Sequence, residues 1–119
     1  IKSLTLGDDL PPQQIEELQI DTVFPNLVLL FVSYQNHDLP FARCDSTSRQ
    51  GARLMSKAEN EYTLALRHVM RRCSSLLFIH LDVVYHFQDT PWKRDYSMIN
   101  QRRIRRKCLM DRLANIRMN

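Results

Sequence analysis

Glycine is scarce in this sequence, and its scarcity argues against a fold built from strands. The 119 residues contain two glycines, Gly7 and Gly51. Tight turns between strands usually need glycine, and the Asn-Gly and Asp-Gly pairs that close short hairpins are absent from the sequence. Few turns favour long helices. The composition therefore predicts an all-α fold.

Long hydrophobic runs are also absent, which argues against a membrane-spanning protein. A span needs about 20 apolar residues, and the apolar runs 27–32 and 76–79 are far shorter. The cysteines Cys44, Cys73 and Cys108 are odd in number and widely spaced. This spacing suits free thiols in a reducing compartment better than a disulfide framework. We therefore expect a cytoplasmic or nuclear protein with no membrane partner.

Acidic residues are nearly missing from the C-terminal end. The net charge of +4 divides into −4 over residues 1–66, +1 over residues 67–92 and +7 over residues 93–119, where nine Lys and Arg face two Asp. A charged partner responds to the local field of a protein and not to its mean charge. The C-terminal segment is therefore where a polyanionic partner is expected.

Apolar spacing predicts two buried helical segments. The run 27–32 is apolar on every side and reaches helix length when Phe24 and Tyr34 are included, with a β-strand as the alternative. From 49 to 88, apolar residues recur in steps of three and four, which predicts one long helix. After Cys73 the opposite face of this predicted helix also becomes apolar, so its second half must be covered on most sides.

The remaining segments complete the expected architecture. Residues 1–10 are expected to form a tail. Pro91 ends the long helix because the residue before a proline avoids the helical conformation, and residues 89–96 form a break before a last helix over 97–116. The chain is long enough for one core. We expect a single domain over residues 1–119, a helical bundle with one long central helix and a basic C-terminal helix.

Five cations occur within the six residues 102–107 of that last helix. Placed on a helix they wrap around much of it, and the acids that would form i,i+4 ion pairs are missing. Such repulsion is tolerated more easily when nucleic acid, an anionic lipid surface or an acidic protein neutralises it. A solvated helix end is the alternative, helped by cations near the negative end of a helix dipole. The predicted polyanion-binding residues are Arg94, Arg102, Arg103, Arg105, Arg106 and Lys107.

Catalytic and metal-binding patterns are absent from the sequence. The histidines lack H-E-x-x-H spacing, and no C-x-x-C pair occurs. His80 falls on the apolar repeat and is expected in the core. Cys73 and His68 are separated by about 500° of helical rotation, so they do not share a face. With no phosphate-binding loop or nucleophile elbow either, we expect no enzyme activity, no catalytic residues, no cofactor and no metal.

Three short segments resemble a known family. They are Tyr62, then Arg72-Cys73-Ser74-Ser75-Leu76, then Arg106-Lys107-Cys108, whose cysteine follows Cys73 by 35 residues. This pattern resembles the C-terminal helical domain of the non-catalytic, regulatory subunit of katanin, most closely the nematode meiotic form. The resemblance covers roughly residues 50–117, and the region before residue 50 does not match the family's preceding helices.

The resemblance implies an adaptor without catalysis of its own. The chain would form a heterodimer with the N-terminal three-helix domain of a microtubule-severing AAA ATPase and help it bind microtubules. Its place would then be the cytoskeleton, at the spindle of meiotic cell division. Acidic tubulin tails would complement the cations of residues 102–107. The expected partner interface is Leu27, Leu30, Phe31, Tyr34, Leu77, Leu81, Tyr85 and Trp92.

Two other functions remain open. The same basic helix is compatible with a helical nucleic-acid-binding domain, although few aromatic side chains lie near it for base stacking. The chain is also compatible with a plain protein-interaction scaffold whose basic helix is only a solvated tail.

Overall fold

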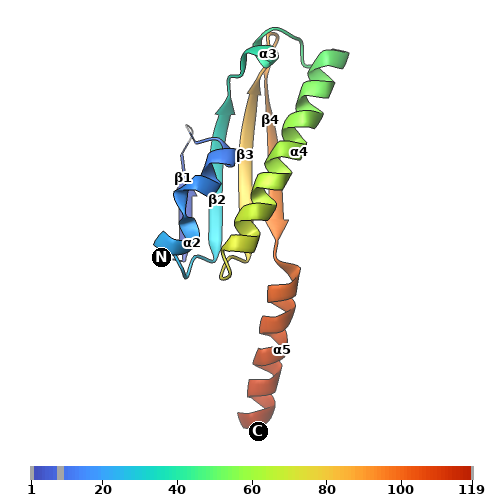
Figure 1. The fold of residues 1–119 in the computed structure, drawn as a ribbon. Helices are drawn as coiled ribbons and strands as arrows, with labels where there is room; N and C mark the ends of the chain where they lie inside the picture. Colours follow the sequence, from blue (N-terminus) through green and yellow to red (C-terminus); the bar gives the residue numbers. More distant parts are fainter. Residues whose placement is uncertain (1, 8–9, 119) are drawn as a thin grey trace.

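A four-stranded mixed sheet forms the centre of the molecule, so the predicted all-α fold is wrong (Figure 1). The computed structural model describes residues 2–7 and 10–118. The strand order is β1-β2-β3-β4, with β1, β2 and β3 parallel and β4 antiparallel to β3. The strands are β1 (Ser3–Leu6), β2 (Leu29–Asn36), β3 (Phe78–His86) and β4 (Pro91–Ile99).

Helices fill the connections between the parallel strands and follow the last strand. The longest, α4 (Arg49–Arg72), begins at Ser48, whose hydroxyl accepts the Gly51 N–H at 3.0 Å. Only glycine fits at position 51, because a Cβ there would lie 2.5 Å from the Asp45 carbonyl oxygen. The other helices are α1 (Pro12–Ile15), the 3-10 helix η1 (Glu16–Leu18), α2 (Ile20–Val23), α3 (Leu39–Ala42) and α5 (Gln101–Met118).

The helices α2 and α4 lie on the same side of the sheet (Figure 1). Crossovers between parallel strands are right-handed in nearly all proteins. The two crossovers here advance in the same direction, from β1 to β2 and from β2 to β3, so their helices reach the same face. No described element covers the opposite face, which we call the open face of the sheet.

The core lies between the sheet and α4. Along β3, buried and half-buried residues alternate without a break, as they do in a strand covered on one face. Tyr62, Leu66 and Val69 of α4 are buried in the same hydrophobic cluster. The strand residues in this cluster are Leu30 and Val32 from β2 and Ile79, Leu81, Val83 and Tyr85 from β3.

The expected long helix over residues 49–88 therefore stops at Arg72, and its second half is strand β3. The all-round apolar character found after Cys73 arises because β3 is a central strand, with α4 on one face and β2 and β4 on its two edges. The run 27–32 is not a helix either. From Leu29 onward it belongs to strand β2, which agrees with the β-strand alternative for this run.

Three terminal and connecting predictions also need correction. The expected tail contains β1, with residues 1, 8 and 9 lying outside the described part of the chain. The expected break over 89–96 contains most of β4, whose first residue is Pro91; a proline is tolerated at the first position of a strand. The last helix begins at Gln101 and not at residue 97, because residues 97–99 pair with β3.

Scarce glycine did not prevent a sheet, because few of its connections are tight turns. Helices connect β1 to β2 and β2 to β3. The β3–β4 hairpin loop spans residues 87–90, and among the described residues the one positive φ is at Gln19. A four-residue loop without a left-handed position does not require glycine. Within the described residues, no helix is long and apolar enough to cross a membrane.

Two adjacent valines test the strand assignment. Val83 is fully buried, whereas its neighbour Val84 is half-buried on the open face. We expect Val83→Ala to lower the free energy of unfolding by about 2 kcal/mol and Val84→Ala to lower it by clearly less. Chemical denaturation of both variants measures the difference. Equal losses would contradict a strand with one covered face.

Candidate functional site

Two chain junctions meet at one end of the sheet. The turn from α4 into β3 (residues 73–77) and the junction of β4 with α5 are joined where the Asn100 N–H donates to the Leu77 carbonyl at 2.9 Å. The hydroxyl of Ser75 anchors the turn by donating to the Leu27 carbonyl at 2.7 Å. The end of α4 and the start of α5 are therefore held beside each other.

A basic hollow lies at this junction. It has a volume of about 500 Å³ and is lined by Ser74, Asn100, Arg102, Arg103 and Arg106. Asn100 also caps α5, because its side-chain oxygen accepts the Arg103 N–H at 3.1 Å. Guanidinium groups beside hydroxyl and amide donors are suited to bind the oxygens of a phosphate or carboxylate.

The arginines occupy the unfavourable end of the helix dipole. Arg102 and Arg103 lie in the first turn of α5, which contains no acidic residue. The N-terminus of a helix carries partial positive charge, so cations there are destabilised and anions are favoured. The helix dipole therefore does not explain these arginines, and the alternative of a dipole-stabilised helix end loses its main support.

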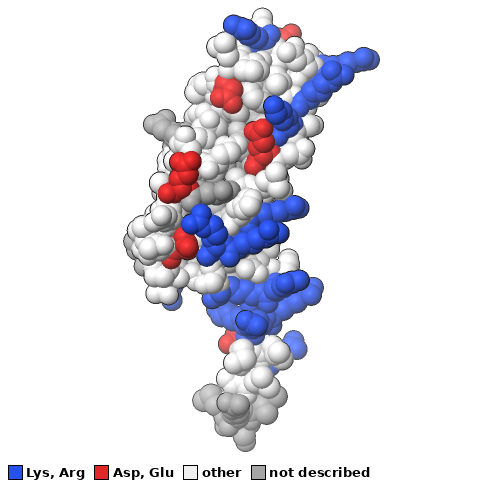
Figure 2. Space-filling model, viewed as in Figure 1, with Lys and Arg blue, Asp and Glu red and all other residues white. Residues whose placement is uncertain are grey.

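Cations from α4 extend the positive surface. Figure 2 shows Lys and Arg side chains gathered over the lower end of α4 and the first turns of α5. Arg71, in the last turn of α4, is exposed. Its neighbour Arg72 lies 3.7 Å from the Asp21 carboxylate. The field at this end of the molecule is therefore shared by two helices.

The structure brings most of the predicted polyanion-binding residues together. Arg102, Arg103 and Arg106 line the basic hollow, and Arg105 and Lys107 are exposed on the same helix. Arg94 is separate. It is five residues before the end of β4, and its guanidinium contacts the Glu59 carboxylate at 3.2 Å. Its charge is thus neutralised within the protein.

The predicted partner interface is not a single surface. Leu27, Leu30, Leu81 and Tyr85 are fully buried in the chain's own core and offer no surface to a partner. The other predicted residues are divided among several places. Phe31, Tyr34 and Leu77 are half-buried, and Trp92 is 42% exposed.

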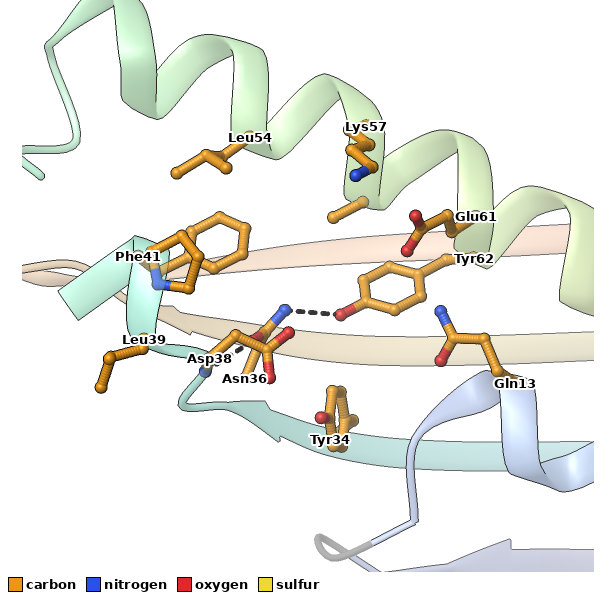
Figure 3. A pocket seen from close by; sticks show the side chains of 12 residues that line it. Gln13, Tyr34, Asn36, Asp38, Leu39, Phe41, Leu54, Lys57, Glu61 and Tyr62 are labelled. Atoms are coloured by element: carbon orange, nitrogen blue, oxygen red, sulfur yellow. Dashed lines mark hydrogen bonds between the residues drawn. The ribbon is translucent and has the colours of Figure 1, made fainter. Parts of the chain in front are cut away.

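A second hollow lies between α4 and the carboxyl end of β2 (Figure 3). Its volume is about 350 Å³, and charged residues of α4, Lys57 and Glu61, lie at its rim. At its floor Asn36 is 1% exposed. Figure 3 shows its side-chain amide pointing toward Tyr62, and the amide donates to the Tyr62 hydroxyl at 2.7 Å.

The Asn36–Tyr62 pair joins the sheet to α4. The Asn36 side-chain oxygen accepts the Asp38 N–H at 3.0 Å, so the amide group is engaged on both sides. Burial raises the pKa of the Tyr62 hydroxyl far above its ordinary value, so this hydroxyl stays neutral. Ligands of parallel sheets bind at the carboxyl ends of strands, but the polar groups here are used to connect elements.

Sequence reasoning missed Ser74 and Asn100 as parts of the basic hollow. Asn100 carried a usable signal, since asparagine is a preferred residue just before a helix. It was overlooked because the helix was expected to begin at residue 97. Ser74 carried no signal of its own, because its place beside α5 depends on the antiparallel pairing of β3 with β4.

Comparisons with protein-family models, with curated proteins and with solved structures find no match for this chain. They therefore give no support to the resemblance to the katanin regulatory subunit. The helical domain that this resemblance implies also differs from the mixed sheet observed.

Loss of the Tyr62 hydroxyl tests the buried pair. We expect Tyr62→Phe to lower the free energy of unfolding by about 1–3 kcal/mol, because the Asn36 amide then lacks a buried partner. Tyr34→Phe is the control, since the Tyr34 hydroxyl makes no hydrogen bond within the described residues. Denaturation of both variants measures the effect, and an equally small loss in both would show that the pair contributes little.

Alkaline pH tests the buried tyrosines together. Burial is the main reason that the pKa values of Tyr62 and Tyr85 are raised and that of Tyr96 is raised to about 12. Above about pH 10 the unfolded chain loses these protons while the folded chain keeps them. The free energy of unfolding should therefore fall as the pH rises through 10. Chemical denaturation between pH 9 and 11.5 measures the free energy of unfolding, and phenolate absorbance measures the ionisation of the tyrosines. Full ionisation of the tyrosines in the folded protein near pH 10 would contradict the raised pKa values.

Proposed function

We propose that this chain is a binding module, without catalysis of its own, whose basic end binds duplex DNA. The observation that carries the proposal is the basic hollow, where three arginines meet at the positive end of α5. Phosphate groups there would neutralise the arginines and interact favourably with the helix dipole. Both effects favour the bound state.

The shape of α5 supports a nucleic acid over a flat acidic surface. The helix spans 18 residues and extends away from the sheet (Figure 1). An α-helix of about 10–12 Å diameter fits the major groove of B-form DNA, which is about 12 Å wide. In the groove, the phosphates of both DNA strands flank the helix. Cations on several sides of α5 would therefore each lie near a negative charge.

The position of the charges along α5 also fits binding of this helix in the major groove of DNA. Five of its cations occupy the first turns, and the exposed apolar residues Leu109, Met110 and Leu113 follow them, with Asp111 and Arg112 in between. Recognition helices often contact DNA through their N-terminal residues. The deep and narrow major groove of double-stranded RNA does not admit side chains in this way, so we propose DNA and not RNA.

The function implied by the katanin resemblance is less well supported by the geometry. Pairing with the N-terminal domain of an AAA ATPase needs a shared apolar surface, and four of the eight residues expected to provide it lie in the chain's own core. Binding to acidic tubulin tails uses the same arginines and remains an alternative prediction, which the experiment below distinguishes from DNA binding.

A pair of charge reversals tests the proposal. We expect the intact chain to bind a duplex of about 25 base pairs with a slope of log K against log salt near −4, as for four to five phosphate contacts. Arg103→Glu with Arg106→Glu should weaken binding at least tenfold and make the slope less steep by about two. Fluorescence anisotropy over a salt series measures both quantities.

The matched control is Arg49→Glu with Arg53→Glu. These residues are exposed in the first turns of α4, at the opposite end of that helix, and the net charge change is the same. The control should retain most of the affinity. Equal loss in both double variants would mean that net charge alone drives binding, and co-sedimentation with microtubules at a salt concentration that abolishes DNA binding would favour the tubulin alternative.

A further inference from the structure

Two aspartates stand directly opposite each other on the open face of the sheet. Asp82 of β3 pairs with Asp95 of β4 in the antiparallel register. Like charges at such paired positions destabilise a sheet. A cation between them would remove this repulsion.

His80 brings a nitrogen ligand to the same place. It precedes Asp82 by two residues, so both side chains project from the same face of β3. Its Nε2 atom lies 3.1 Å from one Asp82 oxygen and 3.8 Å from one Asp95 oxygen. The ligand atoms of the three side chains all lie within 4.8 Å of one another.

We propose that His80, Asp82 and Asp95 bind a divalent first-row transition-metal ion, with Zn²⁺ as the representative ion. Zinc binds imidazole nitrogen and carboxylate oxygen at about 2.0–2.2 Å. Ligand atoms around such an ion are therefore separated by about 3–3.6 Å. The observed separations are 3.1 and 3.8 Å from His80 Nε2 and at most 4.8 Å among all three ligand atoms, so each lies within little more than 1 Å of this spacing.

Ser97 orients the histidine from the neighbouring strand. It pairs with His80 in the register, and its hydroxyl lies 3.0 Å from the His80 Nδ1 atom. Without an ion, Nε2 pairs with Asp82 Oδ1 at 3.1 Å and would carry the proton. With an ion in that place, Nδ1 would donate its proton to the Ser97 hydroxyl and Nε2 would present its lone pair to the metal. Metal-binding histidines nearly always have such a partner on the other ring nitrogen.

The neighbouring lysine leaves room for the ion. Lys93 Nζ lies 3.9 Å from Asp82 Oδ2, whereas His80 lies beside the Oδ1 atom of the same carboxylate. The lysine side chain is also 64% exposed. Lys93 and a metal ion can therefore engage different oxygens of Asp82.

The donor set selects the class of metal. One imidazole with two carboxylates suits zinc and its neighbours better than Mg²⁺ or Ca²⁺, which prefer oxygen ligands alone. Three protein ligands leave at least one position of the ion for water or another ligand. Asp95 is 56% exposed, so that position opens to solvent. The site lies about 13 Å along β4 from Ile99 and thus apart from the basic hollow.

Calorimetric titration of the intact chain with Zn²⁺ tests the proposal, with the visible absorption of Co²⁺ as a second readout. Asp95→Asn and His80→Gln should each weaken Zn²⁺ binding at least tenfold. Ser97→Ala, which removes only the partner of His80, should weaken it about tenfold. Circular dichroism checks that each variant folds, which is expected for Asp95→Asn because it removes a like-charge pair from an exposed position.

The control is His86→Gln, which removes another histidine from the same face of β3. His86 stacks on His37 with ring centroids 4.0 Å apart, so it also shows whether that pair binds Zn²⁺. We expect it to leave the Co²⁺ absorption unchanged. Absence of Zn²⁺ binding, or equal binding by the intact chain and Asp95→Asn, would refute the metal site and leave an ion-pair cluster. DNA binding measured in the presence of a chelator is a separate result, so the two proposals can fail independently.

Discussion

The parallel pairing of β2 with β3 is the interaction on which the rest of the structure depends. All eight residues of β2 take part in it. Parallel neighbours need a long crossover, and here that crossover contains α4, whose Tyr62, Leu66 and Val69 share one hydrophobic cluster with Leu30, Val32, Leu81 and Val83 of the sheet. The same pairing sets the register of β3, and through the hairpin the register of β4. The core, the open face and the origin of α5 all follow from it.

The two proposed sites lie where this arrangement leaves charge unbalanced. At one end of the sheet, the arginines of α5 are placed at the positive end of its dipole, with no acid in the first turn. On the open face, Asp82 and Asp95 oppose each other across two strands. Arg94, by contrast, has its charge matched by Glu59. Both proposals therefore rest on local mismatch of charge and not on the net charge of the chain.

The sequence predicted the basic helix but not the sheet, and the region around His80 shows why. Cys73, Leu76, His80, Val83 and Phe87 fit steps of three and four, which continued the true helical repeat of α4. Ile79, Leu81, Val83 and Tyr85 also fit steps of two, and they are the residues that the structure buries. A central strand is apolar enough to satisfy both periods, so periodicity alone does not separate them. The helical interpretation places His80 in the core, and it therefore hides the proximity of His80 to Asp82 and Asp95.

By itself the sequence determined the segregation of charge, the basic character of the last helix and the helical character of residues 49–72, but not the end of that helix at Arg72. These depend on residues close together in the chain, where a local pattern suffices. Only the tertiary structure decided that Ser74 lies beside Arg103 and that Asp82 faces Asp95. Such neighbours result from the pairing of β3 with β4, and a shift of one residue in this register would place Asp82 and Asp95 on opposite faces of the sheet. The basic helix was visible in the sequence, but the place of Ser74 beside it came from the fold.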